Sequence, residues 1–246
     1  MTVLVLASVK ASPGVTTLAV ALALTWPAGE GRCVRLLEAD PEGGVLAARL
    51  GLKADPNLAT LASASRRGLS PGLLVEHGQA LTGDVRLLAG SVSPERTYTA
   101  LGSMRSLAEA LTTDGSTDSI VDAGRLSPRS PIIEVARQAG MTLLVARPTR
   151  DEVEAVGHRA QALREAGCAV GLVCLHGRSA YPVSEFADAA GVELVGVIGD
   201  DRRTAEALCG AAPLSNRGLT RSSLYRHASD LGMALAERLR PRVLPT

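Results

Sequence analysis

The segment Val9–Thr17, VKASPGVTT, combines residue types and spacing that suit the binding of an anion. A β-branched and Leu-rich run of about seven residues precedes it and an Ala- and Leu-rich run follows, which predicts a buried strand, a glycine-containing loop and a helix. Backbone N–H groups at the start of such a helix point into the gap after the strand, where the helix dipole also favours negative charge. This is the layout of a phosphate-binding loop, and an ordinary tight turn between a strand and a helix is the alternative.

The loop resembles the deviant Walker A motif of the MinD/ParA family of P-loop ATPases, whose pattern is GKGGxGKTT. The positions that match this pattern are Lys10, Gly14, Thr16 and Thr17. The positions that depart from it are Val9, Ala11, Ser12 and Val15. Val15 stands where the ordinary P-loop lysine is expected, and Pro13 removes one backbone N–H from the loop. Because only Lys10 and Lys53 among the 26 basic residues are lysines, a lysine at the family's signature position is not easily explained by chance.

A second, acidic motif follows the predicted strand Arg32–Glu38. The run GRCVRLLEADPEGG resembles the family's GxxVLLIDxDPQGN and places its two acids at Glu38 and Asp40. In the family the second carboxylate lies near the γ-phosphate and the attacking water, so the resemblance implies that Asp40 orients this water or the hydration shell of Mg²⁺. An Asp-Pro turn that opens a helix at Gly44–Leu50 is the alternative, which the distance of the motif from the loop at Lys10 disfavours.

The run DSIVDAGRL resembles a third motif of the family, the Walker B strand DxVIVDxG. It places Asp122 at the carboxyl end of a strand, and the resemblance implies that this carboxylate holds an Mg²⁺-bound water opposite Thr16. A buried strand that ends in Asp-x-Gly also occurs as a plain turn. The three motifs stand in the family's order, each after a predicted strand. The strand ends at Lys10, Asp40 and Asp122 should therefore converge at one edge of the sheet.

The rest of the pattern predicts a single α/β domain, with a doubly wound, mostly parallel sheet flanked by helices as in P-loop NTPases. Further strands are expected at Val85–Leu88, Met141–Ala146, Cys168–Leu175 and Val192–Ile198. Further helices are expected at Leu58–Arg67, Glu95–Leu111, Asp151–Ala166 and Ser222–Arg240, with a turn at Gly68–Gly72. The MinD/ParA-like domain is expected to span residues 1–240, followed by a short tail at residues 241–246.

Two peripheral segments depart from the family. Members that bind adenine usually end the strand that corresponds to Cys168–Leu175 with Asn, whereas this sequence has Leu175 and His176 there. A loop histidine without a partner is expected at His176, and stacking on a base is the alternative. The basic tail after the last helix matches the membrane-targeting helix of MinD poorly, because Pro241 and Pro245 interrupt it. A solvated tail is expected there, rather than a lipid or DNA contact.

Composition narrows the class of protein. The 246 residues are 46% apolar and only 2% aromatic, so the core must be built from Leu, Val, Ala and Ile. A net charge of +1 gives no argument for contact with nucleic acid or an anionic membrane. The four cysteines lack CxxC spacing and fall mostly beside apolar runs, which predicts reduced, buried thiols. No leader sequence and no membrane-spanning apolar stretch are found, so a cytoplasmic location is expected.

The resemblance implies a set of candidate site residues. Those expected to bind the nucleotide are Ser12, Gly14, Val15, Thr16 and Thr17; those expected around Mg²⁺ are Thr16, Asp40 and Asp122; the catalytic candidates are Asp40 and Lys10. The lysine that Val15 replaces normally makes a charge-assisted phosphate contact worth about 1.5–3 kcal/mol, or roughly 10- to 150-fold in affinity. Hydrolysis should suffer further, because phosphoryl transfer depends on positioning and charge stabilisation.

These departures favour a MinD/ParA-like positioning or regulatory protein with a degenerate ATP·Mg²⁺ site, weak or absent ATP binding and little hydrolysis. Such a pseudo-ATPase would act as a dimerising scaffold for an unidentified protein partner or cargo, with Lys10 near the twofold interface. Pilus-localisation proteins of the TadZ/CpaE type, which also have atypical Walker A loops, offer an analogy. The alternative is an active ATPase in which Lys10 supplies the missing charge. An ATP-dependent ligase or synthetase is disfavoured, because those enzymes keep the P-loop lysine.

Overall fold

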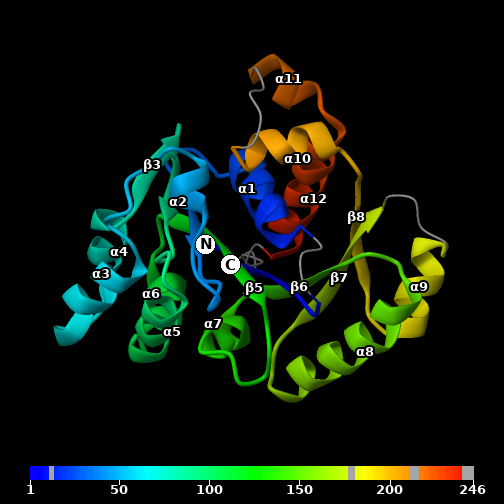
Figure 1. The fold of residues 1–246 in the computed structure, drawn as a ribbon, viewed down its shortest axis with the longest axis horizontal. Coiled ribbons are helices and arrows are strands. Elements are labelled where there is room, and N and C mark those ends of the chain that lie inside the picture. The colour runs from blue at the N-terminus through cyan, green and yellow to red at the C-terminus, as the bar shows by residue number, and fades with distance from the viewer. Residues whose placement is uncertain (11–13, 177–180, 211–215, 240–246) are drawn as a thin grey trace, which may run out of the picture.

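The computed structural model describes residues 1–10, 14–176, 181–210 and 216–239. Within them one eight-stranded sheet runs through the centre of the molecule (Figure 1). Its strands are β1 (Val3–Ser8), β2 (Cys33–Glu38), β3 (Gln79–Thr82), β4 (Val85–Leu88), β5 (Thr117–Arg125), β6 (Met141–Ala146), β7 (Val170–His176) and β8 (Leu194–Gly199). Their order across the sheet is β3-β4-β2-β5-β1-β6-β7-β8.

The sheet is parallel throughout except at one edge, where β3 pairs antiparallel to β4. A parallel strand covered on both faces needs an almost continuous apolar sequence, and β1 and β6 are entirely buried for this reason. The strands that carry the three sequence motifs are β1, β2 and β5, and they are adjacent. Their carboxyl ends therefore share one edge of the sheet.

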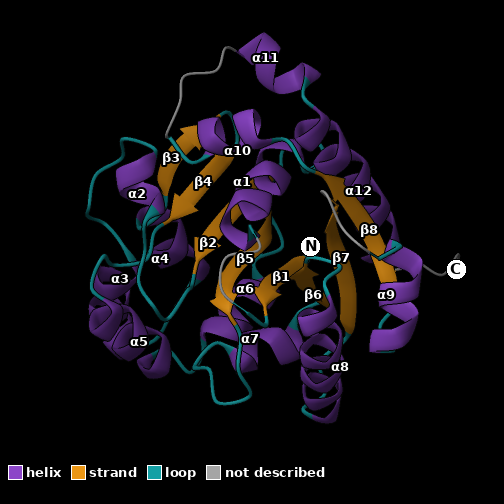
Figure 2. Ribbon diagram, turned by 45° about the vertical axis from the view of Figure 1, so that its right-hand side comes forward, coloured by secondary structure: helices purple, strands orange, loops and turns teal. Residues whose placement is uncertain are grey.

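Helices cover both faces of the sheet (Figure 2). In chain order they are α1 (Val15–Thr25), α2 (Leu46–Arg49), α3 (Leu58–Ala64), the 3-10 turn η1 (Ser65–Arg67), α4 (Pro71–Glu76), α5 (Pro94–Ser103), α6 (Leu107–Thr113), α7 (Ile133–Gln138), α8 (Arg150–Glu165), α9 (Val183–Ala190), α10 (Arg202–Leu208), α11 (Asn216–Arg221) and α12 (Ser223–Leu239). The fold is thus the expected doubly wound α/β architecture.

Alternate residues of β1 point into two separate apolar cores. Leu4 and Leu6 pack in a core that also contains residues of α1, α2, α10 and α12. Val3 and Val5 pack in a second core with residues of α3 to α9. Both cores consist mainly of Leu, Val and Ala, as the low aromatic content requires. The helix α1 is buried on nearly every side.

Several elements differ from the sequence-based predictions. The single helix predicted over Glu95–Leu111 is wrong: α5 and α6 are separate, because Met104 leaves helical geometry with ψ 67°. The turn predicted at Gly68–Gly72 gives way to α4, which Ser70 caps through the backbone N–H of Leu73. The alternative helix at Gly44–Leu50 is present only as the short α2. By contrast, β4 and β6 have the predicted bounds.

Among the cysteines, Cys168 and Cys174 are buried as predicted. The prediction of buried thiols is wrong for Cys33 and Cys209, which are only partly buried. All four are free thiols. Across the described ranges, no helix combines the length and apolar character needed to cross a bilayer. The residues of the predicted tail, 241–246, lie outside the described part of the chain.

Candidate functional site

The carboxyl ends of β1, β2 and β5 border a cavity of about 780 Å³. The cavity is lined by Thr16 and Thr17 of α1, Asp40 after β2, and Asp122 and Gly124 of β5, among others. Pockets of this size typically hold small molecules or cofactors. The structure therefore brings together residues from all three sequence motifs at one edge of the sheet, as expected.

The amino end of α1 is open to an anion. Gly14 precedes the helix in the left-handed conformation, with φ 107° and ψ 27°, which glycine adopts without strain. No side chain of the described residues caps the helix, and its first turn contains no acidic residue. The first N–H groups of α1 are therefore not taken by a side-chain acceptor within the described chain, and the helix dipole adds to their attraction for negative charge. Ser12 lies outside the described residues.

Val15 forms an apolar wall of the cavity where the P-loop ATPase motif has a lysine. Its side chain is only 5% exposed and belongs to the apolar core that includes Leu18 and Leu46. The neighbouring Thr16 and Thr17 also line the cavity, and the Thr17 hydroxyl lies 3.2 Å from the sulfur of Cys209. The first turn of α1 therefore offers hydroxyl groups to a ligand but no cation.

Asp122 is a deeply buried acidic group of the site, with 1% of the residue exposed. Its Oδ1 accepts the backbone N–H of Gly124 at 3.0 Å, while Oδ2 has no hydrogen-bond partner among the described residues. Burial raises the pKa of Asp122 from 3.8 to about 7; the Thr16 hydroxyl and the Gly124 N–H oppose this shift, and Glu38 and Asp40 add to it. The Thr16 hydroxyl is therefore close enough to the carboxylate to influence its pKa.

Asp40 lies between the ends of β2 and β5. Its Oδ1 accepts the backbone N–H of Glu42 at 2.9 Å, and its carboxylate packs against the Cα of Gly124. Burial, together with the charge of Glu42, raises the pKa of Asp40. The backbone of Ala39 donates to the carbonyl of Asp122 at 2.8 Å, which holds the two acidic motifs side by side.

Glu38 has a structural role that the sequence analysis did not identify. It pairs in register with Asp122, and its residue is 1% exposed. Its Oε1 accepts the N–H groups of Val45 and Leu46 at 2.7 and 2.9 Å, and its Oε2 accepts that of Gly90 at 3.0 Å. Glu38 thus caps α2 and ties the end of β4 to it. Burial raises the pKa of Glu38, although these three N–H groups oppose the shift.

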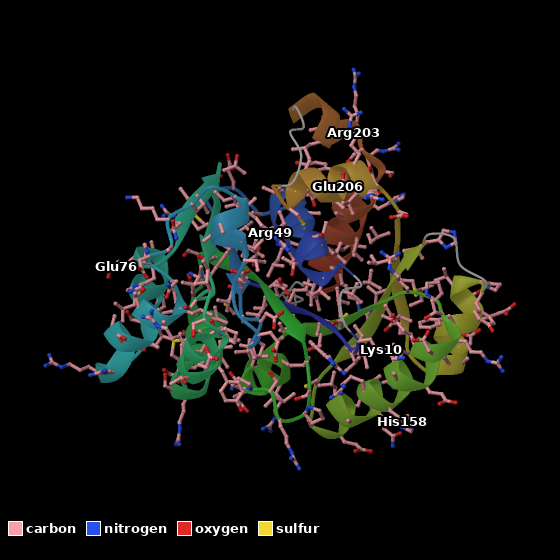
Figure 3. All side chains as sticks on the ribbon, viewed as in Figure 1. Lys10, Arg49, Glu76, His158, Arg203 and Glu206 are labelled. Carbon is pink, nitrogen blue, oxygen red and sulfur yellow. The ribbon has the colours of Figure 1, made fainter. Side chains whose placement is uncertain are left out.

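Lys10 is placed differently from a lysine that contacts phosphates in its own cavity. Its Nζ lies 2.7 Å from Oδ2 of Asp151, in the first turn of α8, and it is not among the residues that line the cavity. Figure 3 shows Lys10 beside α8. The lysine side chain is 39% exposed and the aspartate 70% exposed, so solvent weakens this ion pair. Asp40 and Asp122 therefore meet at the cavity as predicted, but the ammonium group of Lys10 does not join them.

Two arginines that the sequence analysis did not select line the cavity. Arg49 is the last residue of α2, and Arg125 is the last residue of β5 (Arg49 is labelled in Figure 3). The Nε of Arg125 donates to the carbonyl of Val9 at 2.9 Å, so Arg125 links the end of β5 to the start of the loop. The sequence could have indicated Arg125 as a site residue, because it directly follows the Asp-x-Gly motif.

A second, smaller cavity of about 70 Å³ lies on the other side of Gly14. Leu175, His176 and Ile198 help to line it, and a Cβ at Gly14 would lie 3.1 Å from Cδ1 of Leu175. Leu175 therefore packs closely on the loop at the place where the family usually has Asn. His176 is exposed and borders this cavity. This position agrees both with a loop histidine without a partner and with a side chain that stacks on a base.

The site offers oxygen ligands of the kind that magnesium prefers. The buried Oδ2 of Asp122 has no donor among the described residues, and the carboxylate of Asp40 and the hydroxyl of Thr16 border the same cavity. Mg²⁺ commonly uses one or two carboxylates and keeps several waters. In the described part of the chain, no group of three or more His, Cys, Asp or Glu side chains is placed to hold a metal ion by itself. No lysine from the described segments lines the cavity to neutralise phosphate charge.

Comparison with solved structures identifies the fold. A ParA family ATPase from Chlorobium tepidum TLS matches with a TM-score of 0.78 and 16% identity, covering 95% of this chain and 98% of that chain. The septum site-determining protein MinD complexed with Mg-ADP, from Pyrococcus horikoshii OT3, gives 0.75 and 21%, covering 96% of each. A chain of the MinC:MinD cell division protein complex from Aquifex aeolicus gives 0.73 and 16%, covering 100% of this chain and 99% of that chain.

At these identities the similarity establishes the fold, which is that of the ParA and MinD ATPases. No protein-family model matches the sequence. No curated protein matches it either.

Proposed function

We propose that this chain is a positioning or regulatory protein built on the ParA/MinD fold, with a degenerate site for ATP·Mg²⁺. The observation that carries the proposal is Val15. At the position from which a P-loop lysine reaches the phosphates, the chain has an apolar side chain that is 5% exposed and packed in the core. Loss of one charge-assisted phosphate contact weakens binding by roughly 10- to 150-fold. ATP binding is therefore weak or absent.

The acidic residues of the site support the proposal that the protein still binds a phosphate ligand together with Mg²⁺. Asp40 and Asp122 border the cavity, and the buried Oδ2 of Asp122 has no donor within the described residues. In this proposal Asp40 and Asp122 would hold Mg²⁺, which would supply positive charge for a phosphate ligand, while Thr16 and the N–H groups of α1 would orient that ligand. The solved MinD structure with Mg-ADP, which has the same fold, is consistent with this assignment.

Little hydrolysis is expected from this arrangement. Phosphoryl transfer depends on the positioning of the attacking water and on cations that stabilise the developing charge. Asp40 is the candidate to orient that water, since its carboxylate lies at the cavity and burial raises its pKa. The alternative of an active ATPase assigns the missing charge to Lys10. The structure argues against it only in that the ammonium group of Lys10 lies beside Asp151 of α8 and Lys10 does not line the cavity.

The proposed scaffold acts as a homodimer that binds a protein partner or cargo. Three exposed apolar side chains support such an interface: Val45 is 40% exposed, Val92 73% and Tyr98 54%. Val45 lines the cavity, and its neighbour Gly44 donates its N–H to the carbonyl of Ser91 at 2.6 Å, so the segments around Val45 and Val92 are joined. The MinC:MinD complex is a precedent for a partner protein on this fold.

Calorimetric titration with ATP·Mg²⁺, combined with a phosphate-release assay, tests the proposal. The expected result is a dissociation constant of at least about 100 μM, or no measurable heat, with no multiple turnover. Tight binding with sustained phosphate release would overturn it. Sedimentation velocity over a concentration series, with and without ATP·Mg²⁺, tests the scaffold part, and a monomer under every condition would contradict dimerisation.

A further inference from the structure

Charged residues of both signs line the cavity at the carboxyl ends of β1, β2 and β5. The acidic ones are Glu38, Asp40, Glu42 and Asp122, and the basic ones are Arg49, the last residue of α2, and Arg125, the last residue of β5. No ion pair formed within the described residues includes either arginine. Two cations without a carboxylate partner therefore border a cavity that contains an open helix amino end.

Arg125 is the better oriented of the two. Its Nε donates to the carbonyl of Val9 at 2.9 Å, directly before the loop, which fixes one edge of the guanidinium. Among the described residues, no hydrogen bond is made by the terminal nitrogens of Arg125. Arg49 is exposed and has no comparable anchor from its side chain to a described residue. A guanidinium held at one edge loses less conformational freedom when its other donors bind a phosphate.

A third arginine, Arg159 of α8, interacts electrostatically with Arg125 but does not line the cavity. Its Nε is buried without a partner among the described residues. Burial, followed by the charge of Arg125, lowers the pKa of Arg159. Because like charges repel, an anion bound at Arg125 would offset part of this repulsion.

We propose that Arg125 supplies the phosphate-binding cation that the loop lacks at Val15. It approaches the phosphate groups of a Mg²⁺-bound nucleoside di- or triphosphate from the end of β5, instead of from the first turn of α1. This inference rests on the proposed function, because it assumes that the degenerate site still binds nucleotide weakly. It also predicts that the remaining affinity depends on a residue outside the Walker A segment.

The test measures ATP·Mg²⁺ and ADP·Mg²⁺ affinity in four proteins: wild type, Arg125→Gln, Arg125→Lys and Arg129→Gln. Arg129 is a matched control, since it is exposed in the same connection after β5 but does not line the cavity. Loss of the charge in Arg125→Gln should weaken binding by about tenfold. Arg125→Lys should lose only about threefold, less than Arg125→Gln, because it keeps the charge although it loses the planar guanidinium and the anchor to Val9. Arg129→Gln should bind like wild type.

Any other pattern of affinities overturns the inference. Equal affinity in wild type and Arg125→Gln would mean that Arg125 does not contact the ligand. If Arg125→Gln and Arg125→Lys lose the same affinity, the cause is the lost hydrogen bond to Val9. If Arg125→Gln and Arg129→Gln lose the same affinity, the cause is the general surface charge. Undetectable binding in wild type would exclude this role while leaving the proposed pseudo-ATPase intact. Rapid turnover would contradict the proposed function, yet the Arg125 variants would still be informative. Thermal unfolding of every variant checks that it is folded.

Discussion

Gly124 lies so close to Asp40 that a Cβ at Gly124 would collide with the aspartate carboxylate. Gly124 also has a φ of 56°, in the left-handed region that favours glycine. The two residues are 84 positions apart in the sequence, 124 − 40 = 84. The side chain of Asp40, which follows β2, therefore packs directly on the backbone at the end of β5. This contact fixes the position of Asp40 in the cavity.

Gly124→Ala should therefore destabilise the protein and displace Asp40. The change combines an unfavourable backbone conformation, worth about 1–2 kcal/mol, with a steric clash worth about 1–3 kcal/mol more. Gly83→Ala is the control, because Gly83 has a similar φ of 51° but an added Cβ there meets nothing within 4 Å. Urea unfolding of both variants measures the difference, and equal losses would show that the contact with Asp40 is unimportant.

Asp122→Asn should stabilise the protein in the absence of ligand. Burial raises the pKa of Asp122 to about 7, so the folded chain retains a proton that the unfolded chain releases above pH 3.8. Its contribution to the free energy of unfolding therefore falls as the pH rises from about 4 to about 7. A shift of this size sets an upper limit of about 4 kcal/mol, and ~2 kcal/mol is expected because the amide is also buried.

The gain from Asp122→Asn should be largest at pH 8 and close to zero at pH 4. Denaturant unfolding of wild type and variant at both pH values measures it. A variant that is less stable than wild type at pH 8 would show that the carboxylate is satisfied in the folded chain. The expected result would indicate that the site keeps this acid at the expense of stability, as is common where a charge serves a ligand.

The buried ion pair between Arg35 and Asp114 should be needed for stability. The two side chains are 4% and 5% exposed, with Nη2 2.8 Å from Oδ2. Although burial alone would raise the pKa of Asp114, hydrogen bonds from Arg35, Ser116 and Thr117 lower it. Removal of one partner leaves a buried charge unpaired, so Arg35→Met should cost about 3–5 kcal/mol.

The exposed pair of Arg137 and Glu134 provides the comparison for this prediction, with side chains 53% and 46% exposed. Arg137→Met should change the free energy of unfolding by less than about 1 kcal/mol. The double variant Arg35→Met/Asp114→Leu should recover much of the loss, because it leaves no isolated charge. Equal effects of the two single Arg variants would refute the distinction between buried and exposed pairs.

Much of the fold could be predicted because its strands are continuous apolar runs. β6 and β4 have the predicted bounds, and the order of the strands that carry the motifs places Asp40 and Asp122 at one edge. The helix predicted through Met104 was wrong, since apolar periodicity continues across a break that depends on the local backbone. The edge strand β3 was missed because its sequence, QALT, is short and only half apolar.

The site was harder to predict, because its side-chain contacts join residues far apart in the sequence. Glu38 binds backbone groups of Val45, Leu46 and Gly90, and this caps α2 only after β2 and β4 have paired. Lys10 matches the family motif, yet its partner Asp151 is 141 residues away. Residue types and spacing locate the strand ends, whereas the ion pairs are decided by the packing of α8 on the sheet.

Calorimetric titration of wild type and Val15→Lys with ATP·Mg²⁺, followed by a phosphate-release assay, tests the central claim most directly. If a missing cation at Val15 is what weakens the site, the variant should bind ATP about 10- to 100-fold more tightly than wild type, with little turnover. Micromolar binding and multiple turnover in wild type, with no gain in Val15→Lys, would contradict the claim that the ATP site is degenerate.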